Sequence, residues 1–232
     1  MHVFITGVSS GIGFAFLKHF LSQELTITGI GRNQPTIEGN YSFLNCDLAD
    51  LNEVQSLSLK SDAEEILLIN NAGIIGSIQR ISSQTSSDIA EVMTVNSISP
   101  MLLCQKVLQE NPRKKITILN ISSGAANRPI PSWAAYCSSK IALDRFSESL
   151  QLEEDEKKAQ TRVFSVAPGV VDSKMQEKIR ISSSLDFSSL DNFVQLHEKG
   201  ELLDPNIVVN KLVKLLNTSN KTHVVYSIKD ID

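Results

Sequence analysis

The stretch TGVSSGIG at residues 6–13 decides the fold, because it joins a short apolar run, His2 to Thr6, to a helical pattern, Gly13 to Gln23. Gly7 permits a sharp turn, Gly11 lets a phosphate approach the backbone, and Gly13 lets the helix pack closely on the strand. The free N–H groups at the start of such a helix attract a pyrophosphate. The stretch therefore predicts a dinucleotide site that uses Gly7, Ser9, Ser10, Gly11, Ile12 and Gly13.

Two other interpretations of this stretch remain open. Its spacing, GxxxGxG, differs from the GxGxxG dinucleotide fingerprint, so a tight turn with incidental glycines is one of them. Residues 7–11 also satisfy GxSxG, the nucleophile elbow of α/β hydrolases, with Ser9 as nucleophile and His197 or His223 in a triad. An elbow after the first strand leaves no earlier loop for the second oxyanion donor, which disfavours the hydrolase.

Outward from the glycine turn, β-rich runs alternate with helical patterns. This alternation predicts a doubly wound, Rossmann-type α/β fold, with about seven parallel strands in the order 3-2-1-4-5-6-7 and helices on both faces. With no internal repeat or Pro/Gly linker, we expect one domain over 1–232, with an insertion at about 174–204 as a substrate lid. The expected strands are 2–6, 25–30, 41–45, 65–70, 115–120, 161–167 and 222–226; the expected helices are 13–23, 50–60, 86–110 (distorted at Pro100), 131–158 and 205–216.

Composition excludes several classes of protein. The 232 residues carry 22 Lys and Arg against 26 Asp and Glu, with no basic cluster, so we expect no nucleic-acid partner. Apolar stretches are only a few residues long, so we expect no membrane span, and no export signal precedes the first strand. Three cysteines without CxxC spacing and scattered histidines predict a cytoplasmic protein without a metal site.

Tyr136 and Lys140 stand four residues apart near the start of a helix, which places their Cβ atoms on one face about 5–6 Å apart. A neighbouring cation, the helix N-terminus and a bound oxidised nicotinamide together favour the phenolate, so with all three we expect the pKa of Tyr136 to fall below its usual value of about 10. YxxxK alone is often a solvated helix face. Here Ser123 and Asn71 follow two strands of the expected sheet, at the edge where such sheets bind ligands.

In combination these pieces resemble the short-chain dehydrogenase/reductase family over nearly the whole chain. The matching segments, in the family's order, are TGVSSGIG, CDL (46–48), NNAG (70–73), Asn96, Ser123, YCSSK (136–140) and PGVVDS (168–173). The segments VAPGVVDSKMQ (166–176) and HEKGELLDP (197–205) are similar to the sepiapterin reductase and benzil reductase branch of that family.

The resemblance implies roles for individual residues. Tyr136 protonates a carbonyl oxygen that Ser123 also binds, Lys140 tunes Tyr136 and holds the nicotinamide ribose, and Asn96 holds a water that relays protons. Without the resemblance, Ser123 could be a turn hydroxyl, Asn96 a kink residue and Asp47 a helix cap. Further cofactor contacts are implied for Asp47 and Leu48 (adenine), Asn71, Ala72 and Gly73 (ribose side), and Pro168, Gly169, Val171 and Ser173 (carboxamide side).

The cofactor preference depends on the end of the second strand, where a carboxylate would bind the ribose 2′-hydroxyl of NAD. That strand ends in Arg32 with no carboxylate, so we expect NADP(H) to be preferred over NAD(H) through an arginine–phosphate contact. Ser10 stands where many NADP-using relatives carry a basic residue, so we expect the preference to be moderate.

The sequence therefore favours an NADPH-dependent carbonyl reductase that acts on a small ketone or aldehyde, including dicarbonyls and pterin side chains. The main alternative is a non-catalytic NADP(H)-sensing module, and the Ser9 hydrolase is less favoured. We expect a homodimer or homotetramer formed through the long helices after strands four and five. Trp133 is expected either in the pocket or in the core. The expected apolar underside of the lid is Phe187, Leu190, Phe193 and Leu202.

Overall fold

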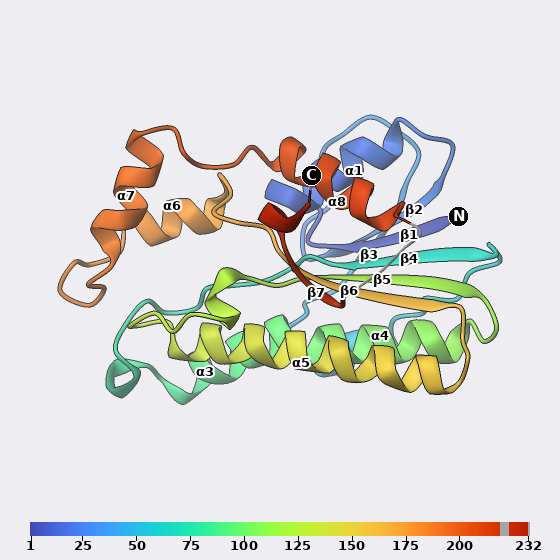
Figure 1. Ribbon diagram of the computed structural model, residues 1–232, viewed down its shortest axis with the longest axis horizontal. Helices are drawn as coiled ribbons and strands as arrows, with labels where there is room; N and C mark the ends of the chain where they lie inside the picture. Colours follow the sequence, from blue (N-terminus) through green and yellow to red (C-terminus); the bar gives the residue numbers. More distant parts are fainter. Residues whose placement is uncertain (219–222, 232) are drawn as a thin grey trace.

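The computed structural model describes residues 1–218 and 223–231 and contains a seven-stranded parallel sheet (Figure 1). Its strand order, β3-β2-β1-β4-β5-β6-β7, is the predicted one. The order reverses between β1 and β4, and ligands of doubly wound sheets bind at the carboxyl ends of the strands near such a reversal. Thr222, where we expected the last strand to begin, lies outside the described residues. The strands are β1 (His2–Thr6), β2 (Thr26–Gly31), β3 (Ser42–Asn45), β4 (Glu65–Asn70), β5 (Lys115–Ile121), β6 (Thr161–Ala167) and β7 (Val225–Ser227).

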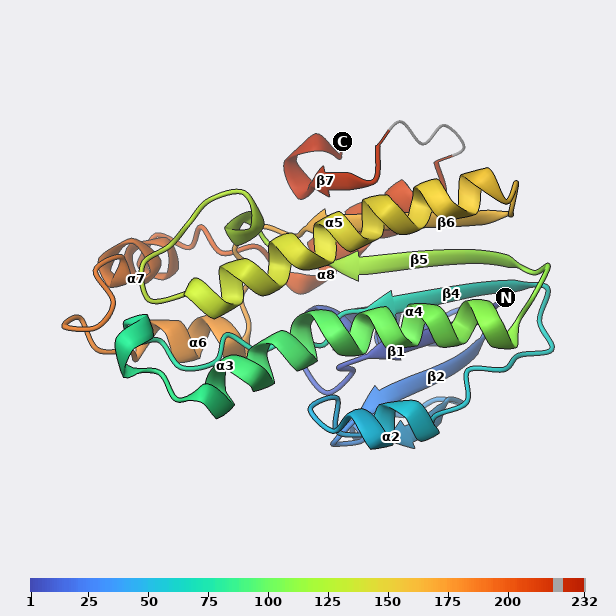
Figure 2. The ribbon, with the colours of Figure 1, turned by 90° about the horizontal axis from the view of Figure 1, so that it is seen from below.

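Helices cover both faces of the sheet. On one face lie α1 (Gly11–Leu21) and α8 (Pro205–Leu216), and on the other α2 (Leu51–Ser56), α4 (Ser99–Glu110) and α5 (Ala134–Glu156) (Figures 1 and 2). Strands buried on both faces are apolar along their length rather than alternating, as β4 shows with all but its first residue buried. Separate apolar cores therefore form on the two faces of the sheet.

The long helix expected over 86–110 is divided by a distortion. Between α3 (Ser86–Met93) and α4 lies one π-helical segment, Thr94–Ile98. Pro100 stands two residues after its end, and because proline has no N–H it cannot donate to the carbonyl of Asn96, four residues earlier. The predicted distortion is confirmed, and it falls on Asn96.

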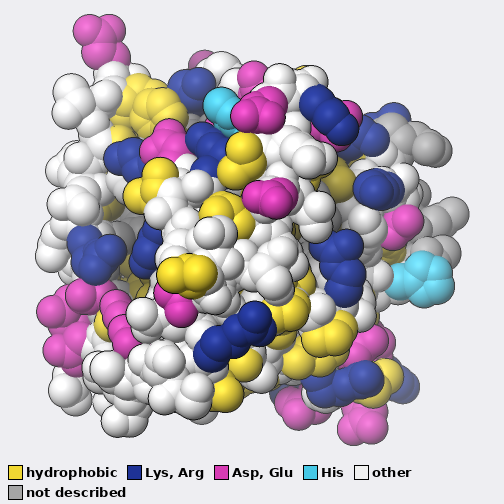
Figure 3. Space-filling view, turned by 90° about the vertical axis from the view of Figure 1, so that its left-hand side faces the viewer, with side chains coloured by type: hydrophobic (Ala, Val, Ile, Leu, Met, Phe, Trp, Pro, Cys, Tyr) yellow, Lys and Arg dark blue, Asp and Glu magenta, His cyan; other side chains and the backbone are white. Residues whose placement is uncertain are grey.

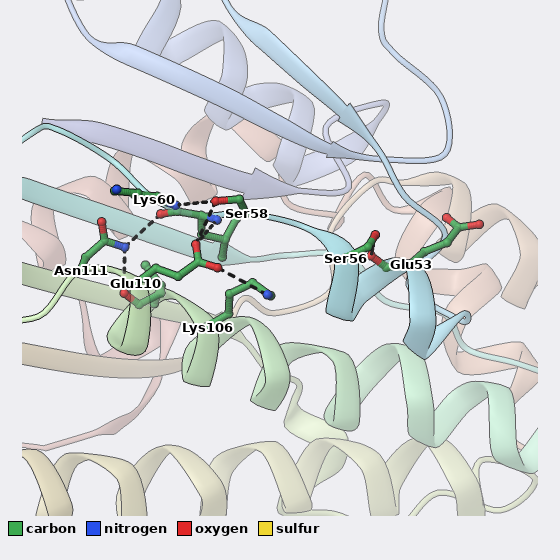
Figure 4. Close-up of polar contacts among 9 residues, drawn as sticks. Glu53, Ser56, Ser58, Lys60, Lys106, Glu110 and Asn111 are labelled. Carbon is green, nitrogen blue, oxygen red and sulfur yellow. Dashed lines mark hydrogen bonds and ion pairs between the residues drawn. The ribbon is translucent and has the colours of Figure 1, made fainter.

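At the amino-terminal edge of the sheet, the chain that follows α2 is fixed to the end of α4 (Figure 4). The Glu110 carboxylate accepts hydrogen bonds from the Leu59 N–H (2.6 Å) and the Ser58 hydroxyl (3.2 Å). Asn111 donates to the Leu59 carbonyl (3.0 Å) and accepts from the Ser61 N–H (2.9 Å). Paired polar groups thus stabilise the edge that lies opposite the predicted site.

The 174–204 segment contains two helices, α6 (Lys174–Arg180) and α7 (Leu190–Glu198), which extend beyond the carboxyl end of the sheet (Figure 1). Its ends are joined, because Val171 and Leu203 form a parallel bridge and the Leu203 N–H donates to the Val170 carbonyl (2.9 Å). The segment therefore leaves and rejoins the fold at one place, beside the carboxyl edge of the sheet.

One expectation about local structure needs correction. The helix expected over 50–60 ends at Ser56. The expected start at residue 86 is observed for α3, where Thr85 and Asp88 form a capping box. Among the described residues, no helix is both long enough and apolar enough to cross a membrane.

Candidate active site

The glycine turn packs α1 closely against the end of β1. Gly7 has a φ of 72°, and its N–H donates to the Ile30 carbonyl at 2.9 Å. A Cβ on Gly13 would lie 2.2 Å from the Gly7 carbonyl oxygen and 2.4 Å from the amide nitrogen of Asn71. No side chain fits at Gly13, so the close helix-to-strand packing expected there is observed.

Asn71 stabilises this turn from the end of β4. Its side-chain amide donates to the carbonyls of Thr6 (2.9 Å) and Gly7 (3.2 Å), and its N–H donates to the Thr6 hydroxyl (3.0 Å). The Asn71 side chain therefore makes its hydrogen bonds to the backbone of the glycine turn. Gly73 is placed differently, since a Cβ there would lie 3.4 Å from Lys140 Nζ. The NNAG segment thus connects the glycine turn to the helix that carries Lys140.

The start of α1 fits a pyrophosphate group. The first N–H groups of a helix have no intrahelical partner. Ser10, the N-cap of α1, makes no capping hydrogen bond through its side chain, and the first turn contains no acidic residue. Gly11 has a φ of 56°, and a Cβ there would lie 3.7 Å from Ser173 Cβ. The N–H groups at the start of α1 can therefore donate to a pyrophosphate without competition from a protein carboxylate.

Arg32 and Asp47 lie together at the ends of β2 and β3. Arg32 Nη1 is 3.9 Å from Asp47 Oδ2, and the side chains are 63% and 41% exposed, so this is a loose surface pair. Asp47 accepts the Ala49 N–H (3.0 Å), whereas Asp50 caps α2, so the interpretation of Asp47 as the helix cap is wrong. Leu48 is buried. Arg32 therefore presents an exposed guanidinium at the rim of the cleft.

Tyr136 and Ser123 meet at the carboxyl end of β5. Tyr136 lies in the first turn of α5 and is 7% exposed. The Ser123 hydroxyl accepts the Ala125 N–H (3.1 Å), so its local role as a turn hydroxyl is also observed. Burial raises the pKa of Tyr136, and a hydrogen bond from Ser123 opposes that rise. The burial of the phenol, which the sequence does not report, therefore opposes the fall expected with a bound oxidised nicotinamide.

Lys140 lies one helical turn after Tyr136 and is 3% exposed. Its Nζ donates to the Ile121 carbonyl (2.9 Å) and lies 5.9 Å from the centroid of the Tyr136 ring. Burial lowers the pKa of Lys140 to about 8, and the charge of Asp144 opposes this shift. Asp144 is itself buried, accepts a hydrogen bond from Ser165 (2.6 Å), and has a pKa raised by burial. Sequence reasoning missed Asp144, although its spacing of four from Lys140 was visible.

Asn96 is fully buried in the π-helical segment. Its side chain accepts the Ile74 N–H (2.8 Å) and donates to the Ile74 carbonyl (2.8 Å) and the Ser139 hydroxyl (3.0 Å). The Asn96 side chain thus binds the segment after β4 to α5. Because Pro100 has no N–H, the Asn96 backbone carbonyl does not receive the hydrogen bond that an ordinary α-helix would give it from that position.

The segment after β6 runs along the same edge of the sheet into α6. Gly169 has a φ of 80°, and a Cβ there would lie 2.8 Å from the Leu203 side chain. The Asp172 N–H donates to the Leu203 carbonyl (3.0 Å), and Ser173 caps α6 by accepting the Gln176 N–H (3.3 Å). Residues 168–173 therefore form the base from which the 174–204 segment rises, beside the glycine turn.

Three aromatic rings belong to the same buried cluster as Tyr136, and we call them the aromatic wall: Trp133, Phe187 and Phe193. Trp133 meets the Tyr136 ring edge-on at a centroid distance of 5.6 Å. It contacts Phe187 at 5.3 Å and Phe193 at 5.1 Å, and both phenylalanines come from the 174–204 segment. Trp133 therefore joins that segment to the site. Of the other residues expected on the underside, Leu190 packs against this cluster and Leu202 is half-exposed.

A pocket of about 480 Å³ opens between the 128–131 loop and α7. Phe193 lines it together with Ile130 and Val170, and Arg128 and Lys199 add positive charge. Tyr136, Ser123 and Lys140 do not line this pocket. It therefore lies on the outer side of the aromatic wall.

The hydrolase alternative finds no triad in the part of the chain that the structure describes, because no hydrogen bond there joins Ser9 to a histidine. Of the two histidines considered for the triad, His197 lies in the last turn of α7 and the His223 ring contacts Tyr226. Within the same residues, no group of three or more His, Cys, Asp and Glu side chains is placed to hold a metal ion.

The doubly wound sheet, the glycine turn, and buried Tyr136 and Lys140 beside half-buried Ser123 are together typical of a dinucleotide-binding oxidoreductase. A family model described as short chain dehydrogenase matches residues 1–183, and the chain belongs to this short-chain dehydrogenase/reductase family. The resemblance noted in the sequence is thereby confirmed.

Similar proteins come from the branch suggested by the sequence. The chain is 32% identical over 234 residues to a benzil reductase ((S)-benzoin forming) of Bacillus cereus, with 94% of each chain covered. It is 29% identical over 238 residues to a sepiapterin reductase of Xenopus laevis, covering 91% of this chain and 89% of that one. The crystal structure of a short chain dehydrogenase/reductase from Saccharomyces cerevisiae superposes with a TM-score of 0.85 at 25% identity, covering 99% and 96%.

Proposed function

We propose that this protein is an NADPH-dependent carbonyl reductase in which Tyr136 is the general acid for a ketone or aldehyde. The observation that carries the proposal is the buried site that Tyr136, Ser123 and Lys140 share, next to the glycine turn. Membership of the family and the similarity to benzil and sepiapterin reductases support carbonyl reduction. Dicarbonyls and pterin side chains belong to the proposed substrate class.

The residues divide the proton chemistry among them. A bound reduced nicotinamide dinucleotide supplies the hydride. Tyr136 donates its phenolic proton to the carbonyl oxygen, and the Ser123 hydroxyl donates a hydrogen bond to that oxygen, where negative charge develops. A raised pKa keeps Tyr136 protonated at neutral pH, as a proton donor requires. Lys140 would hold the ribose hydroxyls, and its charge favours the phenolate left after transfer.

The return of a proton to Tyr136 needs a path to solvent. We propose that the Asn96 backbone carbonyl, which receives no hydrogen bond from Pro100, holds a water beside Lys140. Gly73 supports this placement, since a Cβ there would lie 3.2 Å from Asn96 Oδ1 and 3.4 Å from Lys140 Nζ. A side chain at Gly73 would close the gap between the two groups.

The preference for NADPH is proposed to come from Arg32. Its guanidinium is exposed, and its ion pair with Asp47 is long at 3.9 Å, so a 2′-phosphate can replace the carboxylate as the closer partner. Asp47 remains held by the Ala49 N–H, which keeps it available to the adenine side.

We further propose one domain in which the 174–204 segment is the substrate lid. Phe187 and Phe193 pack on Trp133, which contacts Tyr136, so closure of the segment excludes water from the reacting carbonyl. The lid side chains rather than the proton-transfer residues then decide which carbonyl compounds are accepted.

Replacing Tyr136 with phenylalanine tests the function, because only the hydroxyl is lost. We expect NADPH oxidation with a carbonyl substrate to fall at least about 100-fold, with the NADPH Kd within about twofold. The control is Tyr41→Phe, because the Tyr41 hydroxyl bonds the Pro35 carbonyl (2.8 Å) away from the site. If Tyr136→Phe keeps full turnover, the proposed reductase mechanism is excluded. If the wild-type protein binds NADPH but reduces no carbonyl compound, the sensing module is favoured instead.

A homodimer or homotetramer through α4 and α5 is also proposed. Ile141 and Leu152 on α5 are exposed apolar side chains, which a helix-to-helix interface would cover. A monomer in light scattering at micromolar concentration would contradict this assembly. We place the protein in the cytoplasm, because Cys46, Cys104 and Cys137 are all free thiols.

A further inference from the structure

Asp144 is a buried carboxylate that lies one helical turn after Lys140 on α5. It is 4% exposed and accepts a hydrogen bond from the Ser165 hydroxyl at 2.6 Å. Ser165 is itself fully buried in β6. Burial of an ionised carboxylate costs free energy unless it is both hydrogen-bonded and paired with an opposite charge. The depth of Asp144 therefore indicates a partner of positive charge in the same buried layer.

Lys140 and Asp144 reach the sheet at neighbouring positions. Lys140 Nζ donates to the Ile121 carbonyl at the end of β5 (2.9 Å). The partner of Asp144, Ser165 of β6, lies opposite Asn120 in the parallel pairing of these two strands. With strands about 4.8 Å apart and a rise of about 3.3 Å per residue, the two anchor points are about 6 Å apart. The ammonium and the carboxylate therefore share one layer between α5 and the sheet.

The surroundings of Lys140 contain one opposite charge among the described residues. Asp144 supplies this charge, which opposes the loss of the Lys140 proton. From β5, Lys140 meets the neutral carbonyl of Ile121. On the side of Gly73 and the π-helical segment, the nearby polar side chain is the neutral amide of Asn96. The ionic state of Lys140 therefore depends on Asp144.

The charges that act on Asp144, within the part of the chain that the structure describes, both come from α5. Lys140 favours its ionised form, whereas Glu148, one turn later, disfavours it. Glu148 is partly exposed and pairs with Arg145 at 2.9 Å. Figure 3 shows basic and acidic side chains interspersed over the end of the molecule that carries α6 and α7. Water and salt screen such exposed charges, so they are poor substitutes for a buried carboxylate beside Lys140.

We propose that Asp144 is a positioning residue, whose buried carboxylate keeps Lys140 in its ammonium form and thereby sets the upper pH limit of carbonyl reduction. This inference rests on the reductase function proposed above. The ammonium stabilises the phenolate that Tyr136 becomes after it gives up its proton. Without Asp144, burial would remove the Lys140 proton at a pH closer to neutral, and the phenolate would lose this support. Asp144 therefore acts through Lys140 and not on the substrate.

The size of the effect follows from the position of Lys140. Its pKa is lowered to about 8 by burial even though Asp144 opposes the shift. An opposite charge within about 4–6 Å changes a pKa by about 1–3 units. Asp144→Asn keeps the shape of the side chain and removes its charge. We therefore expect the pKa of Lys140 to fall by a further 1–2 units, about the lower part of that range, in this variant.

The kinetic test measures kcat/KM for NADPH oxidation with 2,3-butanedione, a small dicarbonyl, as a function of pH. This profile reports the essential acid and base of the free protein. We expect wild-type activity to fall at high pH with a midpoint at about 8, and this midpoint to move about 1–2 pH units lower in Asp144→Asn. Ser165→Ala removes the same hydrogen bond but keeps the charge, so its midpoint should stay within about 0.3 unit of wild type. The exposed Glu153→Gln, on the same helix, is the matched control and should have the wild-type profile.

Urea unfolding without cofactor tests the same pairing without turnover. Between the folded pKa of Lys140 and its ordinary value of 10.5, the unfolded chain binds more protons than the folded protein, so stability rises with pH. Asp144→Asn extends this window to lower pH. Its folding equilibrium constant relative to wild type should therefore rise about 4- to 8-fold between about pH 7 and 8.5. In the Lys140→Met background, Asp144→Asn should produce no such rise.

If Asp144→Asn does not fold, the double variant Asp144→Leu, Ser165→Ala replaces both bonded partners by apolar groups and should show the same two shifts. An unshifted kinetic midpoint overturns the inference, and so does a Ser165→Ala midpoint that moves as far as that of Asp144→Asn. An unfolding difference with the same pH dependence in both backgrounds also overturns it, because Asp144 would then act without Lys140. If the wild-type protein reduces no carbonyl compound but the unfolding shift depends on Lys140, the reductase function fails and the control of Lys140 by Asp144 stands.

Discussion

Replacing Lys140 with methionine is expected to stabilise the cofactor-free protein at neutral pH. Lys140 is buried, bonds the Ile121 carbonyl, and has its pKa lowered to about 8 by burial. The folded state therefore holds a charge below pH 8 that the unfolded chain leaves in water. Methionine has a similar length and fills the same space without that charge.

The magnitude follows from the two pKa values. The difference between the ordinary value of 10.5 and about 8, at 1.36 kcal/mol per pH unit, is about 3 kcal/mol at pH 7. Loss of the hydrogen bond to the Ile121 carbonyl destabilises the variant by about 1 kcal/mol, so we expect its free energy of unfolding to exceed that of wild type by about 2 kcal/mol.

The pH dependence gives the sharper test. Between pH 8 and 10.5 the unfolded chain binds more protons at Lys140 than the folded protein does, so wild-type stability rises with pH in that window. Lys140→Met lacks this gain. Its advantage over wild type should therefore be full below pH 8 and fall by about 2 kcal/mol between pH 7 and pH 9.5.

Urea unfolding followed by circular dichroism, at intervals from pH 7 to 9.5 and without cofactor, measures this difference. Lys178→Met, on the exposed side of α6, is the matched control and should show a flat difference near zero. Other titrating groups cancel, because each variant is compared with wild type at the same pH. If the difference in unfolding free energy between Lys140→Met and wild type stays constant from pH 7 to 9.5, the conclusion that Lys140 carries a destabilising buried charge is refuted.

Three further predictions concern the turn, the cofactor and the lid. Gly13→Ala should lower the melting temperature by more than about 10 °C, because the new Cβ would lie 2.2 Å from a carbonyl oxygen, while Gly124→Ala, with open space around it, should change little. Arg32→Ser should raise the KM for NADPH about 10- to 100-fold in steady-state assays and leave that for NADH within about twofold. Phe187→Ala should cost about 3–5 kcal/mol in urea unfolding and raise the substrate KM; Leu185→Ala, at 92% exposure, is the neutral control.

Much of the fold was predictable because its signals are local. Strands buried on both faces are continuous apolar runs, so β4 and β6 were placed with their observed bounds. Pro205 at the first position of α8 marked the start of that helix. The glycine turn and the spacing of Tyr136 and Lys140 are likewise local patterns, and they located the candidate site.

The features that the sequence did not predict depend on contacts between segments that are far apart in the chain. α6 and α7 are short, with seven and nine residues, so each offers only about two turns from which a helical period could be recognised. The rise in the Tyr136 pKa comes from the burial of the phenol, and this burial depends on how distant segments pack, which no local pattern reports. The Gln176 amide is buried without a hydrogen-bond partner among the described residues, and this too depends on what packs around it, which no spacing rule reports.

Six of the seven buried side-chain atoms without partners among the described residues lie at or beyond the carboxyl edge of the sheet, and the seventh, Arg162 Nε, lies near the start of β6. At the amino-terminal edge, Glu110 and Asn111 bond every segment they approach, and such contacts favour the fold. At the carboxyl edge, a charge on Lys140 is buried, and the amide of Gln176 and the indole of Trp133 lack partners. Groups that lower stability persist where the surroundings hold them for another purpose. A ligand that brings negative charge toward Lys140 would relieve the cost of burying that charge, so cofactor binding should stabilise this edge of the sheet more than the opposite one.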